Sequence, residues 1–190
     1  MVMITEDELF RLDSLDEKYE VFDGKLVRMP LGSVQHSEIA MNLMVLLGEF
    51  VRSWKLGIVL GPNLLVVLRS RDGGVIDGFC PDVTFIRKES FPKDFDRTRG
   101  FPSAPDLAVE VVSTDNATFL MGKIQAYLDE GSEEVWVIYP KFRTLYRYRR
   151  DHPDKIRIYH EGDTFEPESL FPGLKIPIAD CFVMDVPEDI

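Results

Sequence analysis

The stretch that decides the fold is residues 105–140, PDLAVEVVSTDNATFLMGKIQAYLDEGSEEVWVIYP. A β-branched run at 107–113 predicts a strand, and the helical period that follows predicts a helix over about 117–130. A second buried strand is expected at 135–139, where a proline ends it. Two strands joined by a helical crossover are usually parallel neighbours, so the stretch predicts a strand–helix–strand unit in an α/β (α+β) fold.

One charge is out of place in this unit. Glu110 lies in the middle of the apolar strand, and period-two alternation puts it on the same face as Ala108 and Val112. A buried carboxylate is costly unless it is paired, hydrogen-bonded or bound to a metal. Glu110 is therefore the first candidate for a functional residue.

Length and composition indicate one folded domain over residues 1–190. The chain is 45% hydrophobic and 29% charged, which is ordinary for a globular protein and argues against disorder. Its net charge of -11 counts against a surface that coats nucleic acid broadly, but not against a local basic groove. The two cysteines are far apart, which favours free thiols in a reducing, cytoplasmic setting. We expect no signal peptide and no membrane span, since no apolar run approaches about 18 residues.

The rest of the chain predicts short strands, two further helices and one long loop. Asp23-Gly24 between two alternating runs is a strong hairpin signal, and the clearest helical period follows it, with His36 in its first turn. The predicted elements are a helix at 5–16 with Thr5 as its cap and Leu9, Phe10 and Leu12 inward, a hairpin at 19–29, a helix at 33–53, strands within 57–68, a turn-rich segment at 69–78, a strand at 82–86, a mobile loop at 87–104, and a hairpin formed by 143–150 and 155–160.

A second acidic residue opens the strand at 82–86. If that strand pairs antiparallel with 107–113, the carboxylates of Asp82 and Glu110 come within reach of one metal ion. Two carboxylates with open positions suit Mg²⁺ (or Mn²⁺), which keeps several waters and binds phosphate oxygens. A metal in such a site activates water and neutralises developing charge on a phosphate.

Lys123 is a third candidate, in the helix that follows the Glu110 strand. Leu120 and Tyr127 flank it at helical spacing. A lysine at the edge of an apolar stripe commonly snorkels to solvent. The alternative is an ammonium group that reaches the metal-bound water or the scissile phosphate, and the pattern leaves both interpretations open.

A basic hairpin is the candidate surface for nucleic acid. Residues 141–160 contain seven Lys or Arg against two Asp, and tyrosines are interleaved with them. Arg143, Arg147 and Arg149 are the expected contacts to a DNA backbone, with bases stacking on the tyrosines. The alternative is a solvated hairpin whose charges only protect the edge of the sheet.

Several motifs spread along the chain form one pattern. They are Tyr19-Glu20, Asp23-Gly24-Lys25-Leu26-Val27, His36, Pro81-Asp82-Val83, the run from Pro105 to Ser113, Lys123, Tyr127, Gly131 and Glu134-Val135-Trp136. The pattern resembles the Uma family of restriction-endonuclease-like proteins, which have the PD-(D/E)XK nuclease core, and it covers about residues 15–185. The resemblance implies a mixed β-sheet flanked by helices, with the site at the acidic strand pair.

The resemblance also assigns roles by position. Asp82 matches the motif aspartate and Glu110 the acidic residue that follows it, and both are implied metal ligands. Val112 stands where the E-x-K form of the motif has its lysine. In this family the lysine lies in the following helix, where Lys123 stands.

Three further positions bear on this assignment. Glu20 and His36 match recurrent polar positions, and the resemblance implies an auxiliary metal or phosphate contact for each. Tyr139 departs from the pattern, because the corresponding strand commonly ends in Asp-Pro.

The resemblance implies a metal-dependent endonuclease that hydrolyses DNA, with a homodimer as the expected assembly. The alternative is a catalytically silent binding or assembly module, which keeps the fold and uses the basic hairpin or a dimer face. A third, weaker hypothesis has the two carboxylates acting as acid and base on a glycoside.

Overall fold

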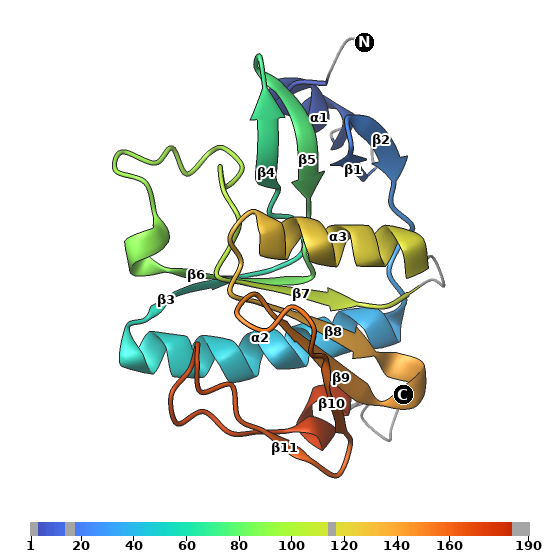
Figure 1. The fold of residues 1–190 in the computed structure, drawn as a ribbon, viewed down its shortest axis with the longest axis vertical. Helices are drawn as coiled ribbons and strands as arrows, with labels where there is room; N and C mark the ends of the chain where they lie inside the picture. The colour runs from blue at the N-terminus through green and yellow to red at the C-terminus, as the bar shows by residue number, and fades with distance from the viewer. Residues whose placement is uncertain (1–3, 14–17, 114–116, 184–190) are drawn as a thin grey trace, which may run out of the picture.

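The computed structural model describes residues 4–13, 18–113 and 117–183, and its centre is a six-stranded sheet in the order β10-β9-β8-β7-β6-β3 (Figure 1). An antiparallel four-stranded sheet, β2-β1-β5-β4, lies at one end of the molecule, beyond α3. The elements are α1 (Glu6–Asp13), β1 (Tyr19–Phe22), β2 (Lys25–Arg28), α2 (Val34–Trp54), β3 (Gly57–Leu60), β4 (Val66–Arg71), β5 (Gly74–Phe79), β6 (Val83–Arg87), a 3-10 turn η1 (Lys88–Ser90), β7 (Leu107–Val111), α3 (Ala117–Asp129), β8 (Glu134–Tyr139), η2 (Pro140–Phe142), β9 (Thr144–Arg149), β10 (Arg157–His160), β11 (Thr164–Phe165), β12 (Ile176–Pro177) and η3 (Ile178–Phe182).

The crossover unit has the predicted topology. β7 and β8 are parallel neighbours, with Leu107 opposite Glu134, and α3 connects them. β6 pairs antiparallel with the other side of β7, and Val83 lies opposite Val109. The predicted mixed sheet is confirmed, and its topology brings the beginning of β6 beside the end of β7.

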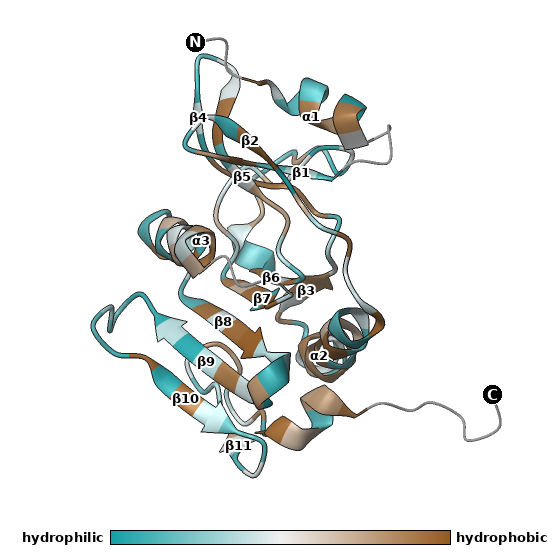
Figure 2. Ribbon diagram, turned by 90° about the vertical axis from the view of Figure 1, so that its right-hand side faces the viewer, coloured by the Kyte–Doolittle hydropathy of each residue, from teal (hydrophilic) through white to brown (hydrophobic). Residues whose placement is uncertain are grey.

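Helices cover both faces of the six-stranded sheet (Figure 2). Because successive residues of a strand point to opposite faces, β7 directs Val109 and Val111 into the core that α2 covers, and Ala108 into the core that α3 covers. α2 contributes Leu43 to the first core, and α3 contributes Ile124 to the second. The same alternation places the Glu110 side chain on the α3 face, where a helix residue can pair with it.

The prediction for residues 69–78 is wrong. These residues form most of the β4–β5 hairpin, in which Asp72 and Gly73 make the two-residue turn with positive φ angles of 51° and 78°. Asp23-Gly24 makes the predicted β1–β2 hairpin with the same geometry, at φ angles of 48° and 70°. The outer half of β4 is exposed and β5 contains two glycines, so neither strand shows a clear apolar alternation.

The long loop at 87–104 is held by aromatic residues. The rings of Phe91, Phe95 and Phe101 have centroids 5.6 to 5.9 Å apart. Phe101 is buried and forms a parallel bridge with Val66 in β4. One end of the loop is thereby anchored to the four-stranded sheet, and the mobility of the rest stays a prediction.

Thr5 caps α1 as predicted. The Glu8 N–H donates to Thr5 Oγ1 at 3.3 Å, and the Thr5 N–H donates to the Glu8 carboxylate at 2.8 Å. Leu9 is buried, but Phe10 was wrongly expected to face inward: it is exposed, because adjacent residues of a helix point about 100° apart. Residues 14–16 of the predicted helix lie outside the described residues. Within the described part of the chain, no helix is long and apolar enough to cross a membrane.

Candidate active site

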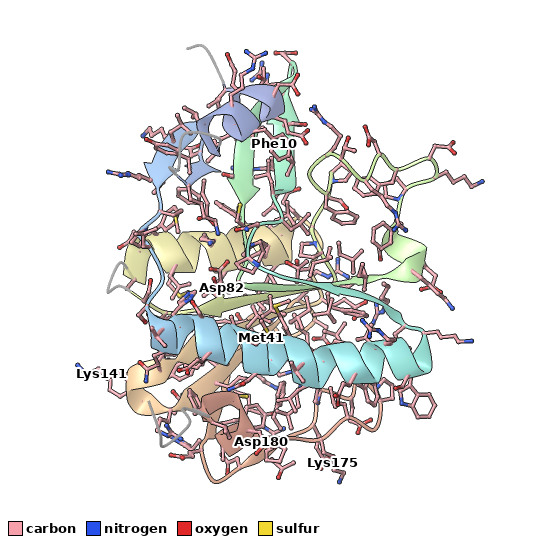
Figure 3. All side chains as sticks on the ribbon, turned by 180° about the vertical axis from the view of Figure 1, so that it is seen from behind. Phe10, Met41, Asp82, Lys141, Lys175 and Asp180 are labelled. Atoms are coloured by element: carbon pink, nitrogen blue, oxygen red, sulfur yellow. The ribbon has the colours of Figure 1, made fainter. Side chains whose placement is uncertain are left out.

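Asp82 directly precedes β6, and Glu110 lies in the adjacent strand β7, so the two residues are neighbours as predicted. The Val111 N–H donates to Asp82 Oδ2 at 2.8 Å, and the Asp82 N–H donates to the Val109 carbonyl at 3.0 Å. These two hydrogen bonds join Asp82 to the residues on either side of Glu110. Figure 3 shows Asp82 between α2 and α3, at the edge where β6 begins and β7 ends.

Lys123 joins this pair from α3. Its ammonium is 2.9 Å from a Glu110 carboxylate oxygen and 2.9 Å from Glu20 Oε1. The side chain is buried, so the interpretation of a snorkelling lysine is wrong. Burial alone would lower the pKa of Lys123, but the Glu110 and Glu20 carboxylates outweigh it and raise that pKa. The amine therefore stays an ammonium.

Glu20 reaches the site from β1. It is fully buried, and its Oε1 accepts hydrogen bonds from Lys123 and from the backbone N–H of Cys80, the latter at 2.8 Å. Its other oxygen, Oε2, is buried and has no hydrogen-bond partner among the described residues. Glu20 thus holds the ammonium against the end of β7 and keeps one acceptor unused inside the site.

Tyr127 is a member of the site that the sequence reasoning treated only as a helix-stripe residue. Its hydroxyl donates to Glu110 Oε1 at 2.9 Å. Burial, together with the Glu110 charge, raises the pKa of Tyr127 well above its usual value, so the hydroxyl stays a donor. The available signal was its position four residues after Lys123, because residues at that spacing share one face of a helix.

His36 contacts Asp82 from the first turn of α2. Ser33 caps that helix by accepting a hydrogen bond from the His36 N–H at 3.2 Å, and the His36 Nε2 lies 3.1 Å from Asp82 Oδ2. The hydrogen bond to Asp82 raises the pKa of His36, against the opposing effect of burial. Of the two auxiliary residues, His36 therefore touches Asp82 and Glu20 touches Lys123.

Glu110 has a strongly shifted acidity. Burial raises its pKa from 4.5 to about 7, against the lowering effect of Lys123, and the nearby charges of Glu20 and Asp82 add to the rise. Its carboxylate thus gains a proton close to neutral pH when no further cation is near.

These side chains surround a pocket of about 270 Å³. Among its lining residues are Lys18, Met29, Pro30, Leu31, His36, Pro62, Asn63, Cys80, Asp82, Glu110, Val112, Phe119, Leu120 and Lys123. The pocket is wide enough to admit a small polar group, and Asp82, Glu110 and Lys123 all form part of its wall.

The two carboxylates suit a hard divalent cation that takes only one or two ligands from the protein. Within the described ranges, no group of three or more His, Cys, Asp and Glu is arranged to hold a metal ion. Asp82 and Glu110 supply two carboxylates at one pocket. Mg²⁺ is commonly held by one or two carboxylates, with waters and substrate phosphates in the other positions. The donor set therefore suits Mg²⁺ or Mn²⁺, with most of the coordination left open.

The chain departs from the motif at Val112, where the motif has a lysine, and at Tyr139, where it has an aspartate. Val112 lines the pocket and extends the β7 ladder, since its N–H donates to the Ile138 carbonyl at 2.9 Å. Lys123 brings an ammonium to the same pocket from α3. Tyr139 packs on Tyr146 with ring centroids 4.6 Å apart, and it brings no carboxylate to the site.

The predicted contacts on the basic hairpin are engaged within the protein. Arg147 is buried and donates to the buried Glu134, with its Nε 2.8 Å from the carboxylate, so it is a structural residue and is wrong as a nucleic-acid contact. Arg143 pairs with Glu161 at 2.6 Å, and Arg149 pairs with Asp151. Acidic neighbours therefore neutralise these three arginines, whereas the other four Lys or Arg residues of the hairpin form no ion pair among the described residues.

Comparison with known proteins identifies the fold and the family of this chain. The fold resembles a solved structure described as "a putative nuclease belonging to DUF820" from Anabaena variabilis ATCC 29413, with a TM-score of 0.78 and 21% sequence identity over 94% of this chain and 97% of that chain. At this identity the likeness shows the fold, a nuclease-type mixed sheet flanked by helices. No curated protein matches. The profile of the Uma2 family, described as "Putative restriction endonuclease", matches residues 6–179. Because this match covers most of the chain, the protein belongs to the Uma2 family.

Proposed function

We propose that this protein is a Mg²⁺- or Mn²⁺-dependent endonuclease that hydrolyses phosphodiester bonds of DNA. The observation that carries the proposal is the buried contact of 2.9 Å between the Lys123 ammonium and Glu110, beside Asp82 in one pocket. Two carboxylates and one lysine at the same point are the groups that metal-assisted phosphodiester hydrolysis needs. The description of the Uma2 family and of its structural relative as nucleases supports this assignment.

Asp82 and Glu110 would hold the cation. When bound, a divalent cation lowers the pKa of its water and neutralises charge on the phosphate. The Val111 N–H and His36 both contact Asp82 Oδ2, and they fix the orientation of that carboxylate. Tyr127 fixes Glu110 in the same way, through its hydroxyl.

Lys123 acts as a fixed positive charge in this scheme. Glu20 and Glu110 raise its pKa, so it does not lose its proton to become a general base. A preorganised ammonium stabilises negative charge that develops on a transferring phosphate, and such electrostatic stabilisation is a large contribution to catalysis. Glu20 is a positioning residue, because it contacts the lysine.

The experiment is cleavage of supercoiled plasmid with Mg²⁺ or Mn²⁺. We expect Asp82→Asn and Glu110→Gln to lose at least about 100-fold in rate, since each removes an anionic oxygen that holds the cation. Glu166→Gln, which removes an exposed carboxylate paired with Lys175, is the matched control and should cleave like wild type. Calorimetric titration with Mn²⁺ provides a readout independent of turnover. Unchanged cleavage by both site variants would refute the mechanism.

A lysine transplant tests the role of Lys123. Val112 lines the same pocket and lies two residues from Glu110, on the same side of the strand. Lys123→Met should abolish cleavage, and adding Val112→Lys should restore part of it by returning an ammonium to the site. A folded wild-type protein that binds DNA but cleaves none with either metal would support the alternative, a catalytically silent binding module.

A further inference from the structure

A second groove runs along β3, the strand at the edge of the six-stranded sheet. It encloses about 960 Å³, and five cationic side chains line it: Arg52, Lys55, Lys88, Arg97 and Arg99. No acidic residue is among the described residues that line it. The whole chain has 33 acidic and 22 basic side chains, so this groove is a local reversal of the net charge.

Three of these five cationic side chains have no acidic partner among the residues that the structure describes. Arg99 pairs with Glu6 and Asp7, and Lys88 lies 3.3 Å from Glu89. Arg52, Lys55 and Arg97 are exposed and form no ion pair with any residue that the structure describes. The groove thus presents positive charge that no acidic neighbour among the described residues compensates.

Aromatic rings lie among these charges. Phe91 and Phe95 are half-buried, line the groove and have ring centroids 5.8 Å apart, with the buried Phe101 behind them. Unpaired bases stack on such rings, while their phosphates follow the surrounding cations. The base faces of a duplex are already stacked inside the helix, so only a single strand can use both features.

The groove and the active-site pocket lie next to each other, on either side of the turn after β3. β3 pairs antiparallel with β6, and Leu60, which lines the groove, lies opposite Thr84. Thr84 is two residues from Asp82, which corresponds to about 7 Å along a strand. The turn after β3 forms a shared wall, with Pro62 and Asn63 lining the pocket and Leu64 lining the groove.

The length of the groove suits a short polynucleotide. Lys88 lies six residues beyond Asp82, so the path along β6 from Asp82 to this cation of the groove is about 20 Å. A stacked strand has one phosphate per about 3.4 Å, which gives room for about six nucleotides.

We propose that the β3 groove binds a single-stranded segment of the nucleic acid and leads it to the Asp82–Glu110 pocket. The proposal rests on the proposed function for the identity of the polymer, and it adds that the substrate has an unpaired stretch beside the bond to be cut. A duplex without such a stretch would bind more weakly, because it cannot reach Phe91 and Phe95.

The test measures binding of the full chain to fluorescein-labelled oligothymidylate of about 20 nucleotides by fluorescence anisotropy, in EDTA so that no cleavage occurs. The groove variant is Arg52→Gln/Lys55→Gln/Arg97→Gln. Each lost phosphate contact costs about five-fold at about 0.1 M salt, so we expect about 100-fold weaker binding and a salt slope smaller by about 2. The matched control, Arg150→Gln/Lys155→Gln/Arg157→Gln, removes three exposed cations of the basic hairpin that form no ion pair among the described residues, and it should bind like wild type.

A second variant tests stacking separately from charge. Phe95→Leu keeps every cation, so it should weaken oligothymidylate binding with an unchanged salt slope and leave duplex binding unchanged. Equal binding by the groove variant and wild type, or a loss confined to the hairpin variant, would overturn the proposal. So would a change of oligomeric state in the groove variant without a change of affinity, since the groove would then be the contact with a second copy of this chain.

Failure of the groove and failure of the nuclease assignment give different results. If the groove is wrong but the nuclease assignment is right, the groove variant cleaves plasmid and binds oligonucleotide like wild type. If the nuclease assignment is wrong, wild type binds the oligonucleotide through the groove in EDTA but cleaves nothing when Mg²⁺ or Mn²⁺ is added.

Discussion

Replacing Lys123 by Met removes the only cation that contacts both Glu20 and Glu110 among the described residues. The apolar stem is kept at similar length, so the change isolates the charge. Glu20 is left fully buried with one backbone hydrogen bond, from Cys80, and Glu110 keeps only the Tyr127 hydroxyl. Removing one partner of a buried ion pair costs about 3–5 kcal/mol, because the other charge stays buried and unpaired. We therefore expect the free energy of unfolding to fall by that amount.

The assay is urea denaturation followed by circular dichroism and by the fluorescence of the buried Trp136. Lys175→Met is the control, because Lys175 also lies 2.9 Å from a glutamate, Glu166, but at an exposed position where an ion pair contributes little. The loss in Lys123→Met should shrink as the pH falls through the pKa of Glu110, since protonation of Glu110 removes one of the unpaired charges. If Lys123→Met is as stable as Lys175→Met well above the Glu110 pKa, the buried triad is not electrostatically coupled as described.

Three further substitutions test other contacts. Burial raises the pKa of Glu110 to about 7, so between pH 4.5 and 7 the folded metal-free protein binds more protons than the unfolded chain. The free energy of unfolding should therefore fall with rising pH in this range, by at most about 3 kcal/mol. Denaturant titrations in EDTA should show no such fall for Glu110→Gln. Arg147→Met leaves the buried Glu134 carboxylate without its cation and should lower the free energy of unfolding by about 3–5 kcal/mol in the same assay, with oligonucleotide affinity unchanged. Reduced affinity at wild-type stability would show instead that Arg147 contacts nucleic acid. Gly122→Ala puts a methyl group 2.5 Å from Phe22 Cζ and should cost about 1–3 kcal/mol, while Gly162→Ala, with nothing within 4 Å, should unfold at the wild-type temperature.

The sequence by itself determined the crossover unit and its misplaced charge. β-branched runs on either side of a helical period specify two strands and a helix, and the short connections make the strands parallel neighbours. Alternation along β7 then fixed which face carries Glu110. The sequence offered the antiparallel pairing of β6 with β7 only as a condition for bringing Asp82 near Glu110, and the structure meets that condition.

Only the tertiary structure decided which charges are paired. Glu20 meets Lys123 across 103 residues of sequence, and Arg147 meets Glu134 across 13, by a contact between neighbouring strands. Composition therefore suggested a basic hairpin whose three predicted contact arginines are ion-paired. It did not reveal the β3 groove, whose cations come from the end of α2, the turn after β6 and the long loop. Periodicity is a local property of the chain and can be read from it directly. Ion pairing and surface charge depend on side chains that folding brings together from distant segments, and no local pattern contains that information.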